Sequence, residues 1–365
     1  MTTTATVPPP PAAGITNSFT AGRLPAWAPW ALLAASLVVV GVVFAIIRES
    51  TGGSFNVVGT VFFGVVLFDV LLFVLSNLVE GARQARNRLV TSLVCTAFVV
   101  ALLPLVSLIA TVVVEGVPRF DIAFFTESMR NVIGEGGGAL HAITGTLLIT
   151  GMATLISVPV GLLAAIYLVE YGTGHLARAI TFFVDVMTGI PSIVAGLFAF
   201  AFLALITDDP GIRFGFGGSI ALSLLMIPVV VRSSEEMLKI VPNELREASY
   251  ALGVPKWLTI LKVVIPTSIA GIATGVTLAI ARVIGETAPL LIIAGFTASM
   301  NYDLFQNRMM TLPVFVYNQY AQPGTDVNAY LERAWAAALT LILIVMTLNL
   351  IARLIARIFS PKLGR

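Results

Sequence analysis

The sequence has little charge and almost no cysteine or histidine. Only 11% of its 365 residues are charged and 58% are hydrophobic, whereas soluble domains are about 25% charged and about 45–50% apolar. The single cysteine, Cys95, excludes an internal disulfide and a cysteine-based metal site. His141 and His175 are the only histidines and lie far apart, so we expect no metal centre. This is the composition of a polytopic membrane protein, and a net charge of +2 gives no reason to expect nucleic-acid binding.

The N-terminal segment lacks the features of a secretory signal peptide, which are a basic start and an early apolar core. Residues 1–26 are instead rich in threonine, proline and alanine. Such a segment has too little apolar surface to fold. We predict that residues 1–26 form a disordered cytoplasmic tail.

Eight stretches are apolar and long enough to cross a bilayer, which takes about 20 helical residues. They cover approximately 28–47, 55–79, 89–114, 142–169, 179–206, 218–233, 267–294 and 334–358. Irregular backbone cannot face lipid, so these segments must be helices. We predict an all-α polytopic membrane protein with about eight transmembrane helices, of which 218–233 is the shortest.

Lysine and arginine are enriched in the cytoplasmic flanks of membrane helices. With the N-terminus placed in the cytoplasm, fourteen of the 21 Lys and Arg residues fall on the cytoplasmic side and six on the outer side. The outer six are Arg48, Arg119, Arg130, Arg213, Arg308 and Arg333. This asymmetry predicts that both termini are cytoplasmic.

The spans divide the chain into an N-terminal helix pair and a block of six helices. We predict an accessory transmembrane hairpin over 27–80 and a core over 81–365, and we find no internal repeat. Two outer segments are long, roughly 115–141 and 295–333, and TLPVFVYNQYAQPG in the second favours a short interfacial helix and a turn. One cytoplasmic loop, 234–266, is also long.

The loop 234–266 contains signals for a short helix that lies between two membrane helices. Pro242 and Asn243 suit a helix start, and Gly253 suits a position just past a helix end. Pro255 and Lys256 then begin a second helix that returns to the membrane. By shape alone, the short helix is either an ordinary connector or a docking element.

The residues of this loop resemble the EAA loop of ABC importer permeases. Glu247-Ala248-Ser249 is followed by three residues, Gly253, nine residues and Val263-x-Ile265-Pro266. The family pattern is EAA, three residues, G, nine residues and I-x-L-P, so three positions differ mildly. The resemblance implies that this helix docks on an ATP-binding subunit and couples ATP-driven closure to the membrane helices. The residues assigned to ATPase coupling are Glu247, Ala248, Ser249, Gly253 and Pro266.

The chain has no GxxxxGK[ST] phosphate-binding loop. We therefore expect that it is not an enzyme and holds no cofactor. ATP would be bound and hydrolysed by a separate subunit.

The segment ARVIGETAPLL, residues 281–291, places Arg282 and Glu286 within a predicted span. Charge at mid-bilayer is costly and usually faces a bundle interior or a water-filled path. A spacing of four predicts that the two side chains share one helix face, although Gly285 and Pro289 weaken the helix there. The pair is either a structural ion pair or a site for an anion, for which the guanidinium fork is suited.

Other polar side chains also allow two interpretations. Thr188 and Ser192 flank Gly189-Ile190-Pro191, and they either adapt the backbone to a kink or line a pore. Arg232 lies where the sixth span meets the cytoplasm, as a membrane anchor or an inner gate. We assign Arg282, Glu286, Thr287, Arg232, Ser192 and Thr188 to a substrate path, with no catalytic or metal-binding residue.

Four segments together resemble the A-type permease subunit of phosphate-specific ABC importers: GIPSIVAGL at 189–197, VVVRSSEEMLKIVPNELREAS at 229–249, ARVIGETAPLL, and TLPVFVYNQYA at 311–321. The resemblance implies a type I ABC importer permease core of six helices in a bacterial cell membrane. It implies inorganic phosphate as substrate. The implied partners are a homologous second permease subunit, an ATP-binding subunit dimer and an extracytoplasmic phosphate-binding protein. The N-terminal helix pair lies outside this pattern.

Three alternatives stay open from the sequence. A related ABC permease for another oxyanion would share most of these features. An ion-coupled anion carrier would explain Arg282 and Glu286 but not the EAA-like loop. A membrane scaffold or signalling subunit would sense phosphate without moving it.

Overall fold

A computed structural model describes residues 22, 24–51 and 55–359, and all regular elements among them are helices. Most of the predicted tail, 1–21 and 23, lies outside the described residues. Contacts between Cα atoms divide the chain into two units, Met1–Leu108 and Ile109–Arg365. Each unit is described by itself.

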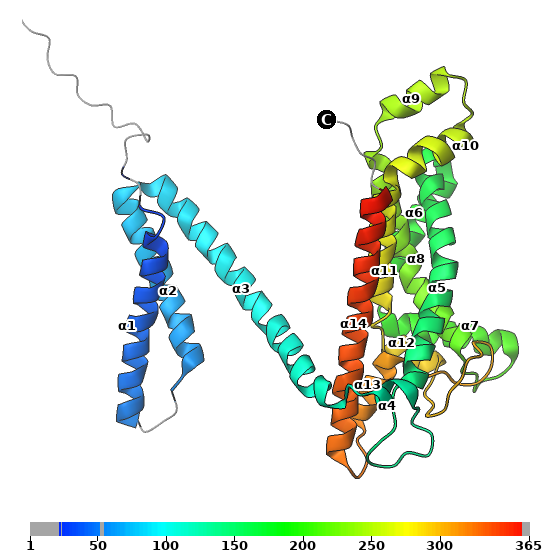
Figure 1. The fold of residues 1–365 in the computed structure, drawn as a ribbon. Coiled ribbons are helices and arrows are strands. Elements are labelled where there is room, and N and C mark those ends of the chain that lie inside the picture. Colours follow the sequence, from blue (N-terminus) through cyan, green and yellow to red (C-terminus); the bar gives the residue numbers. More distant parts are fainter. Residues whose placement is uncertain (1–21, 23, 52–54, 360–365) are drawn as a thin grey trace, which may run out of the picture. The chain divides into compact units, whose positions relative to one another are not determined.

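The first unit contains α1 (Ala28–Thr51), α2 (Val57–Val79) and the first part of α3 (Ala82–Gly116), as Figure 1 shows. Helices α1 and α2 pack on each other as a hairpin. Asn56 caps α2 by accepting a hydrogen bond from the Gly59 N–H at 2.8 Å. Buried Asp69 of α2 accepts a hydrogen bond from Ser92 of α3.

Glu80, between α2 and α3, organises the polar end of this unit. Its carboxylate accepts two hydrogen bonds from Arg88, at 2.6 and 2.7 Å, one from the Ser76 hydroxyl and one from the Leu24 N–H. The Arg88 hydrogen bonds are the main cause that lowers the pKa of Glu80 to about 2. The carboxylate therefore stays charged and ties both helices to residue 24.

The second unit contains the remaining elements. They are η1 (Val117–Arg119), α4 (Ile122–Thr126), α5 (Leu140–Ile166), η2 (Tyr167–Tyr171), α6 (Gly174–Thr188), α7 (Ser192–Thr207), α8 (Gly215–Ile240), α9 (Asn243–Ala251), α10 (Lys256–Thr259), η3 (Ile260–Val264), α11 (Ile265–Val283), α12 (Ala288–Ile293), α13 (Leu312–Ala321) and α14 (Val327–Phe359). Helix η1 is a 3-10 helix, and η2 and η3 are π-helical. The short helix predicted within TLPVFVYNQYAQPG is confirmed as α13.

Helices α9 and α10 lie at one end of this unit, and α4, α7 and α13 lie at the other (Figure 1). We call these the α9 end and the α13 end. The C-terminal end of α14 lies at the α9 end (Figure 1). The long helices of this unit run between these two ends (Figure 1).

Among the described residues, seven helices are long and apolar enough to cross a membrane, or eight if the bent pair α6 and α7 forms one span. This confirms the predicted number. The prediction of a continuous helix over 179–206 is wrong, because α6 and α7 are bent by 113° around Gly189-Ile190-Pro191. The prediction of a continuous helix over 267–294 is also wrong, because α11 ends at Val283 and α12 begins at Ala288.

Helix α8 is the centre of the second unit and packs against α5, α6, α7, α11 and α12. It spans Gly215–Ile240, well beyond the predicted 218–233, because small and polar residues extend both ends. The buried Ser219 hydroxyl donates to the Ile149 carbonyl of α5 at 3.0 Å. Small residues let membrane helices approach closely, and Ser hydroxyls satisfy the buried backbone. The low hydropathy of this segment therefore reflects its burial.

Arg333 of α14 holds the glycine-rich segment around Gly134 and Gly136 in place at the α13 end. Its side chain is fully buried and donates to the carbonyls of Gly134 and Gly136 at 2.7 and 3.0 Å, and to Gln319 at 3.0 Å. The predicted outer arginine is therefore a structural clamp on this segment.

Gly145 of α5 offers a test of how closely α5 packs at the α13 end. A Cβ atom at Gly145 would lie 1.9 Å from the Met310 carbonyl oxygen, whereas a Cβ atom at Gly151, on the same helix, meets no atom within 4 Å. We expect Gly145→Ala to destabilise the protein by at least about 3 kcal/mol. Gly151→Ala should be neutral or stabilising by about 0.5–1 kcal/mol. Thermal unfolding in detergent measures both, and equal melting temperatures would contradict this packing.

Candidate functional site

The predicted docking helix exists as α9, Asn243–Ala251, and it ends as predicted. Pro242 precedes its first residue. Gly253 has φ +74, the left-handed region that favours glycine. The Gly253 N–H donates to the Tyr250 carbonyl at 2.9 Å and the Val254 N–H to the Ser249 carbonyl at 3.2 Å. These two bonds are the Schellman arrangement, which closes the helix and turns the chain back.

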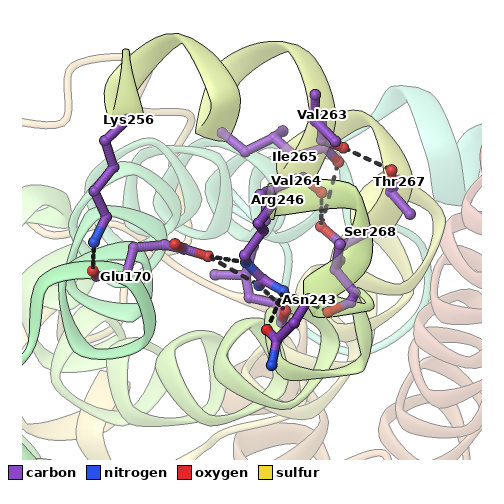
Figure 2. A network of polar contacts seen from close by, with 11 residues as sticks. Glu170, Asn243, Arg246, Lys256, Val263, Val264, Ile265, Thr267 and Ser268 are labelled. Carbon is purple, nitrogen blue, oxygen red and sulfur yellow. Dashed lines mark hydrogen bonds and ion pairs between the residues drawn. The ribbon is translucent and has the colours of Figure 1, made fainter. Parts of the chain in front are cut away.

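Helix α9 is fixed to the membrane helices by Arg246. Its guanidinium donates to the Glu170 carboxylate, at 2.9 and 3.1 Å, and to the Leu238 carbonyl at 3.0 Å. The Glu170 and Arg246 side chains are only 5% and 12% exposed. Figure 2 shows Arg246 between Glu170 and Asn243. A buried ion pair with these extra bonds joins α9 to η2, at the end of α5.

Lys256 of α10 makes a second connection to η2. Its ammonium group donates to the Glu170 carbonyl (Figure 2) and lies 4.8 Å from the centre of the Tyr171 ring. Arg246 of α9 and Lys256 of α10 therefore bind the same residue, Glu170. Glu170 could not be predicted from the sequence, because 76 residues separate it from Arg246 and no local pattern relates them.

The residues predicted for ATPase coupling divide between two faces of α9. Glu247 and Ala248 are exposed. Ser249 is buried, and its hydroxyl lies 2.8 Å from the Thr259 hydroxyl of α10. Ser249 therefore ties α9 to α10, whereas Glu247 and Ala248 face outward.

Exposed apolar side chains also lie on α9, just after it and on α10. Leu245, Leu252 and Trp257 are 42%, 83% and 58% exposed. We call this set, with Glu247 and Ala248, the α9 face. Its mixture of apolar groups and one carboxylate is typical of a protein-binding surface.

Pro266 lies just inside α11, where the helix changes register. Proline has no N–H to donate, and the preceding Ile265 N–H donates to the Ile260 carbonyl five residues back. The Thr267 and Ser268 hydroxyls donate to the carbonyls of Val263 and Val264 at 2.6 and 2.9 Å (Figure 2). Pro266 thus accompanies the π-helical η3 that links the α9 loop to α11.

The two broken spans meet beside each other. A Cβ atom at Gly196 of α7 would lie 2.5 Å from the Cα atom of Pro289 of α12, so the first turns of α7 and α12 are in direct contact. Thr188 ends α6, and its hydroxyl donates to the Val184 carbonyl at 2.8 Å. Ser192 begins α7, and Thr287 precedes α12. The structure therefore brings these two breaks close to each other.

Arg282 and Glu286 do not share a helical face, and that prediction is wrong because α11 ends at Val283. The Glu286 N–H donates to the Val283 carbonyl in the turn that follows. Among the described residues, Arg282 and Glu286 form no ion pair with each other or with any other group. Arg282 is exposed on this single chain and Glu286 is half-buried.

Arg232 of α8, in contrast, is held by two carboxylates. It pairs with Asp185 of α6 and with Glu235 at 2.7 Å, and Lys239 also donates to Glu235 at 2.7 Å. A Cβ atom at Gly275 of α11 would lie 2.5 Å from Ser233, so Arg232 lies near the level of Gly275. Arg282 is seven residues farther along α11, roughly 10 Å nearer the α13 end. The two arginines therefore occupy different depths.

The two carboxylates near the α9 loop offer a test of these assignments. Glu170→Gln removes a buried charge partner of Arg246, and we expect it to destabilise the protein by about 3 kcal/mol. Glu247→Gln changes an exposed group without a partner among the described residues, and thermal stability in detergent should change by less than about 0.5 kcal/mol. Equal losses in the two variants would show that the division of α9 into two faces is incorrect.

Comparisons with known proteins agree with this architecture. Residues 157–365 match the family model described as "Binding-protein-dependent transport system inner membrane component". A chain in the crystal structure of a bacterial alginate ABC transporter in complex with alginate pentasaccharide-bound periplasmic protein has a TM-score of 0.55, at 14% identity, and covers 77% of this chain and 97% of that chain. That likeness concerns the fold alone.

Relatives at higher identity cover most of the chain. "Phosphate transport system permease protein PstA 1" of Mycobacterium tuberculosis (strain CDC 1551 / Oshkosh) is 48% identical over 279 residues, which are 75% of this chain and 89% of that protein. "Phosphate transport system permease protein PstA" of Pasteurella multocida (strain Pm70) is 38% identical over 289 residues, 79% of this chain and 99% of that protein. The chain therefore belongs to the family of binding-protein-dependent transport system inner membrane components.

Proposed function

We propose that this chain is a transmembrane permease subunit of an ATP-driven importer of inorganic phosphate. The observation that carries the proposal is the α9 face, an exposed docking surface fixed to the membrane helices by Arg246 and Glu170. The identity of 48% with a phosphate transport system permease protein supports phosphate as the substrate. The chain forms part of the translocation path, and catalysis of ATP hydrolysis belongs to another subunit.

The α9 face suits an ATP-binding subunit, which would bind ATP and supply the driving force. The Glu247 carboxylate can form charge-assisted hydrogen bonds to such a partner, and Leu252 and Trp257 can enter an apolar groove. Movement of α9 would pass through Ser249 to α10 and through Arg246 to α5. Both connections lead into helices that pack on α8 or α11.

The unpaired Arg282 supports a path shared with a second permease subunit. A lone arginine is costly when it faces lipid. On this single chain it is exposed, so we infer that a second, homologous permease subunit or a water-filled cavity faces it. Glu286, Thr287, Thr188 and Ser192 lie around the same helix breaks and would line the path there. Arg232, with its two carboxylates, would form a gate at a second depth.

Docking of α9 on an ATPase places the α9 end in the cytoplasm. The C-terminal end of α14 then also lies on the cytoplasmic side, and eight crossings in all, α14 included, would bring the N-terminus to the same side. The α13 end faces outward, where a phosphate-binding protein would deliver its ligand. ATP binding and hydrolysis would alternate access between the two ends.

A first test separates docking from folding. We expect Glu247→Gln, in an importer assembled in proteoliposomes, to hydrolyse ATP with little phosphate uptake, because closure of the ATPase is no longer transmitted. Glu236→Gln, an exposed glutamate on α8 outside the α9 face, is the matched control and should couple normally. The measurement is the amount of phosphate transported per ATP hydrolysed. A wild-type ratio for Glu247→Gln would exclude docking of the ATPase through Glu247.

A second test concerns the path. We expect Arg282→Gln to assemble and hydrolyse ATP but to reduce phosphate uptake at least about tenfold, since the guanidinium supplies charge-assisted hydrogen bonds to the anion. Arg130→Gln serves as control, because Arg130 is exposed and forms no ion pair with another described residue. Uptake at the wild-type rate in Arg282→Gln would remove this residue from the path. Competition by sulfate or molybdate in the same assay identifies a permease for another oxyanion, and uptake without ATP identifies an ion-coupled carrier.

A further inference from the structure

A polar pocket opens at the α13 end, away from both helix breaks. It has a volume of about 700 Å³, which lies in the range of small-molecule sites. Its walls come from the α7–α8 connection, including Asp209 and Arg213, and from the α12–α13 connection, including Ser299, Asn307 and Arg308. None of these residues belongs to the path assigned above.

Two arginines from these separate connections converge on one glycine. A Cβ atom at Gly295 would lie 3.2 Å from the Cδ atom of Arg213 and 3.3 Å from the Cδ atom of Arg308. Gly295 has φ +71, so it supplies both the left-handed turn after α12 and the space for the two side chains. The two positive charges are thus brought together by the fold.

Neither guanidinium is neutralised within the described part of the chain. No hydrogen bond or ion pair joins the guanidinium group of Arg213 or of Arg308 to another described group, and both residues are exposed. The one acidic residue in the pocket wall is Asp209, whose carboxylate accepts a hydrogen bond from the Gly211 N–H at 2.8 Å. Adjacent like charges repel each other, so this arrangement favours an anion between them.

The pocket wall is ordered by its own hydrogen bonds. The Asn301 side-chain amide donates to the carbonyls of Gln306, Asn307 and Arg308, at 2.8, 3.4 and 3.1 Å. The Met309 N–H donates to the Ala294 carbonyl at 3.1 Å. These bonds fix the backbone on both sides of Arg308 and bring it next to the end of α12, so the arginine pair is pre-organised.

The α7–α8 connection is joined to the same wall. The Phe214 N–H donates to the Ile293 carbonyl at 3.0 Å and the Phe216 N–H to the Leu304 carbonyl at 2.6 Å. The rings of Phe216 and Phe305 lie 4.9 Å apart between centroids. Arg213 therefore keeps its place beside Arg308 through contacts between the two connections.

We propose that Arg213 and Arg308 form an outer capture site for a tetrahedral oxyanion, namely inorganic phosphate. Each guanidinium fork can donate two parallel hydrogen bonds to phosphate oxygens, and Ser299 and Asn307 in the wall can supply further polar contacts. The inference rests on the proposed function, because the site would hold phosphate after delivery and before it reaches the helix breaks. It adds a binding step at the α13 end that the path residues do not provide.

The test compares Arg213→Gln, Arg308→Gln and the double variant with wild type and with Arg130→Gln, in the assembled importer. Equilibrium dialysis measures binding of labelled phosphate to the nucleotide-free complex without any binding protein. Proteoliposomes measure ATP-dependent uptake across a range of concentrations of phosphate-loaded binding protein. Thermal melts confirm that each variant is folded, and Arg213→Lys with Arg308→Lys retains the charge while it removes the fork.

We expect the double Gln variant to weaken the phosphate binding that dialysis measures by about tenfold or more and to slow uptake. The double Lys variant should bind with intermediate affinity, and Arg130→Gln should match wild type. If the double Gln variant binds phosphate in dialysis as tightly as wild type does, the proposed capture site is wrong. If only the dependence on binding protein changes, the arginines contact that protein and the capture site is likewise wrong. If wild type transports no phosphate yet binds it through Arg213 and Arg308, the proposed function fails and the site stands.

Discussion

The whole second unit depends on covering its two helix breaks with protein. Backbone groups that leave a helix cannot be left facing lipid, and this chain interrupts two membrane-crossing helices, at Gly189-Ile190-Pro191 and at residues 284–287. The contact between Gly196 and Pro289 places the resulting half-helices α7 and α12 against each other. Both also pack on α8. Close packing around α8 thus makes irregular backbone tolerable inside the membrane, and with it the polar side chains that the breaks present.

The two arginines of the proposed path have opposite environments, and this contrast carries functional information. Arg232 is neutralised within the chain by Asp185 and Glu235, so its charge has no need of a partner subunit. Arg282 has no such pair among the described residues and lies exposed. One membrane arginine thus has carboxylate partners within the chain and the other has none in the part that the structure describes. This fits the proposed path, in which a second subunit would lie opposite Arg282. This agrees with a permease that works as part of an assembly.

Local signals predicted the short helix α9 and its two ends. These ends follow from Pro242 and Gly253, because a helix start and a left-handed residue depend only on neighbouring backbone. Helix α13 and the number of spans could also be predicted. The true extent of α8 could not, since hydropathy measures preference for lipid and this helix is surrounded by protein.

Contacts between distant segments were beyond prediction. The hydrogen bonds of Glu170 with Arg246 and the convergence of Arg213 and Arg308 depend on tertiary packing, which no spacing along the chain encodes. The position of Arg282 and Glu286 was misjudged for a related reason. A four-residue spacing places two side chains on one face only in a regular helix. Gly285 and Pro289 weaken the helix here, and the break already begins after Val283.

Gly253 shows what kind of structural constraint acts at the end of α9. Its φ of +74 excludes most L-residues, yet a Cβ atom there would meet nothing within 4 Å. The constraint at this position is therefore one of handedness and not of volume. A residue of the opposite chirality prefers this φ, as glycine tolerates it. Among the amino acids that ribosomes use, the achiral one is the nearest available to that mirror-image residue.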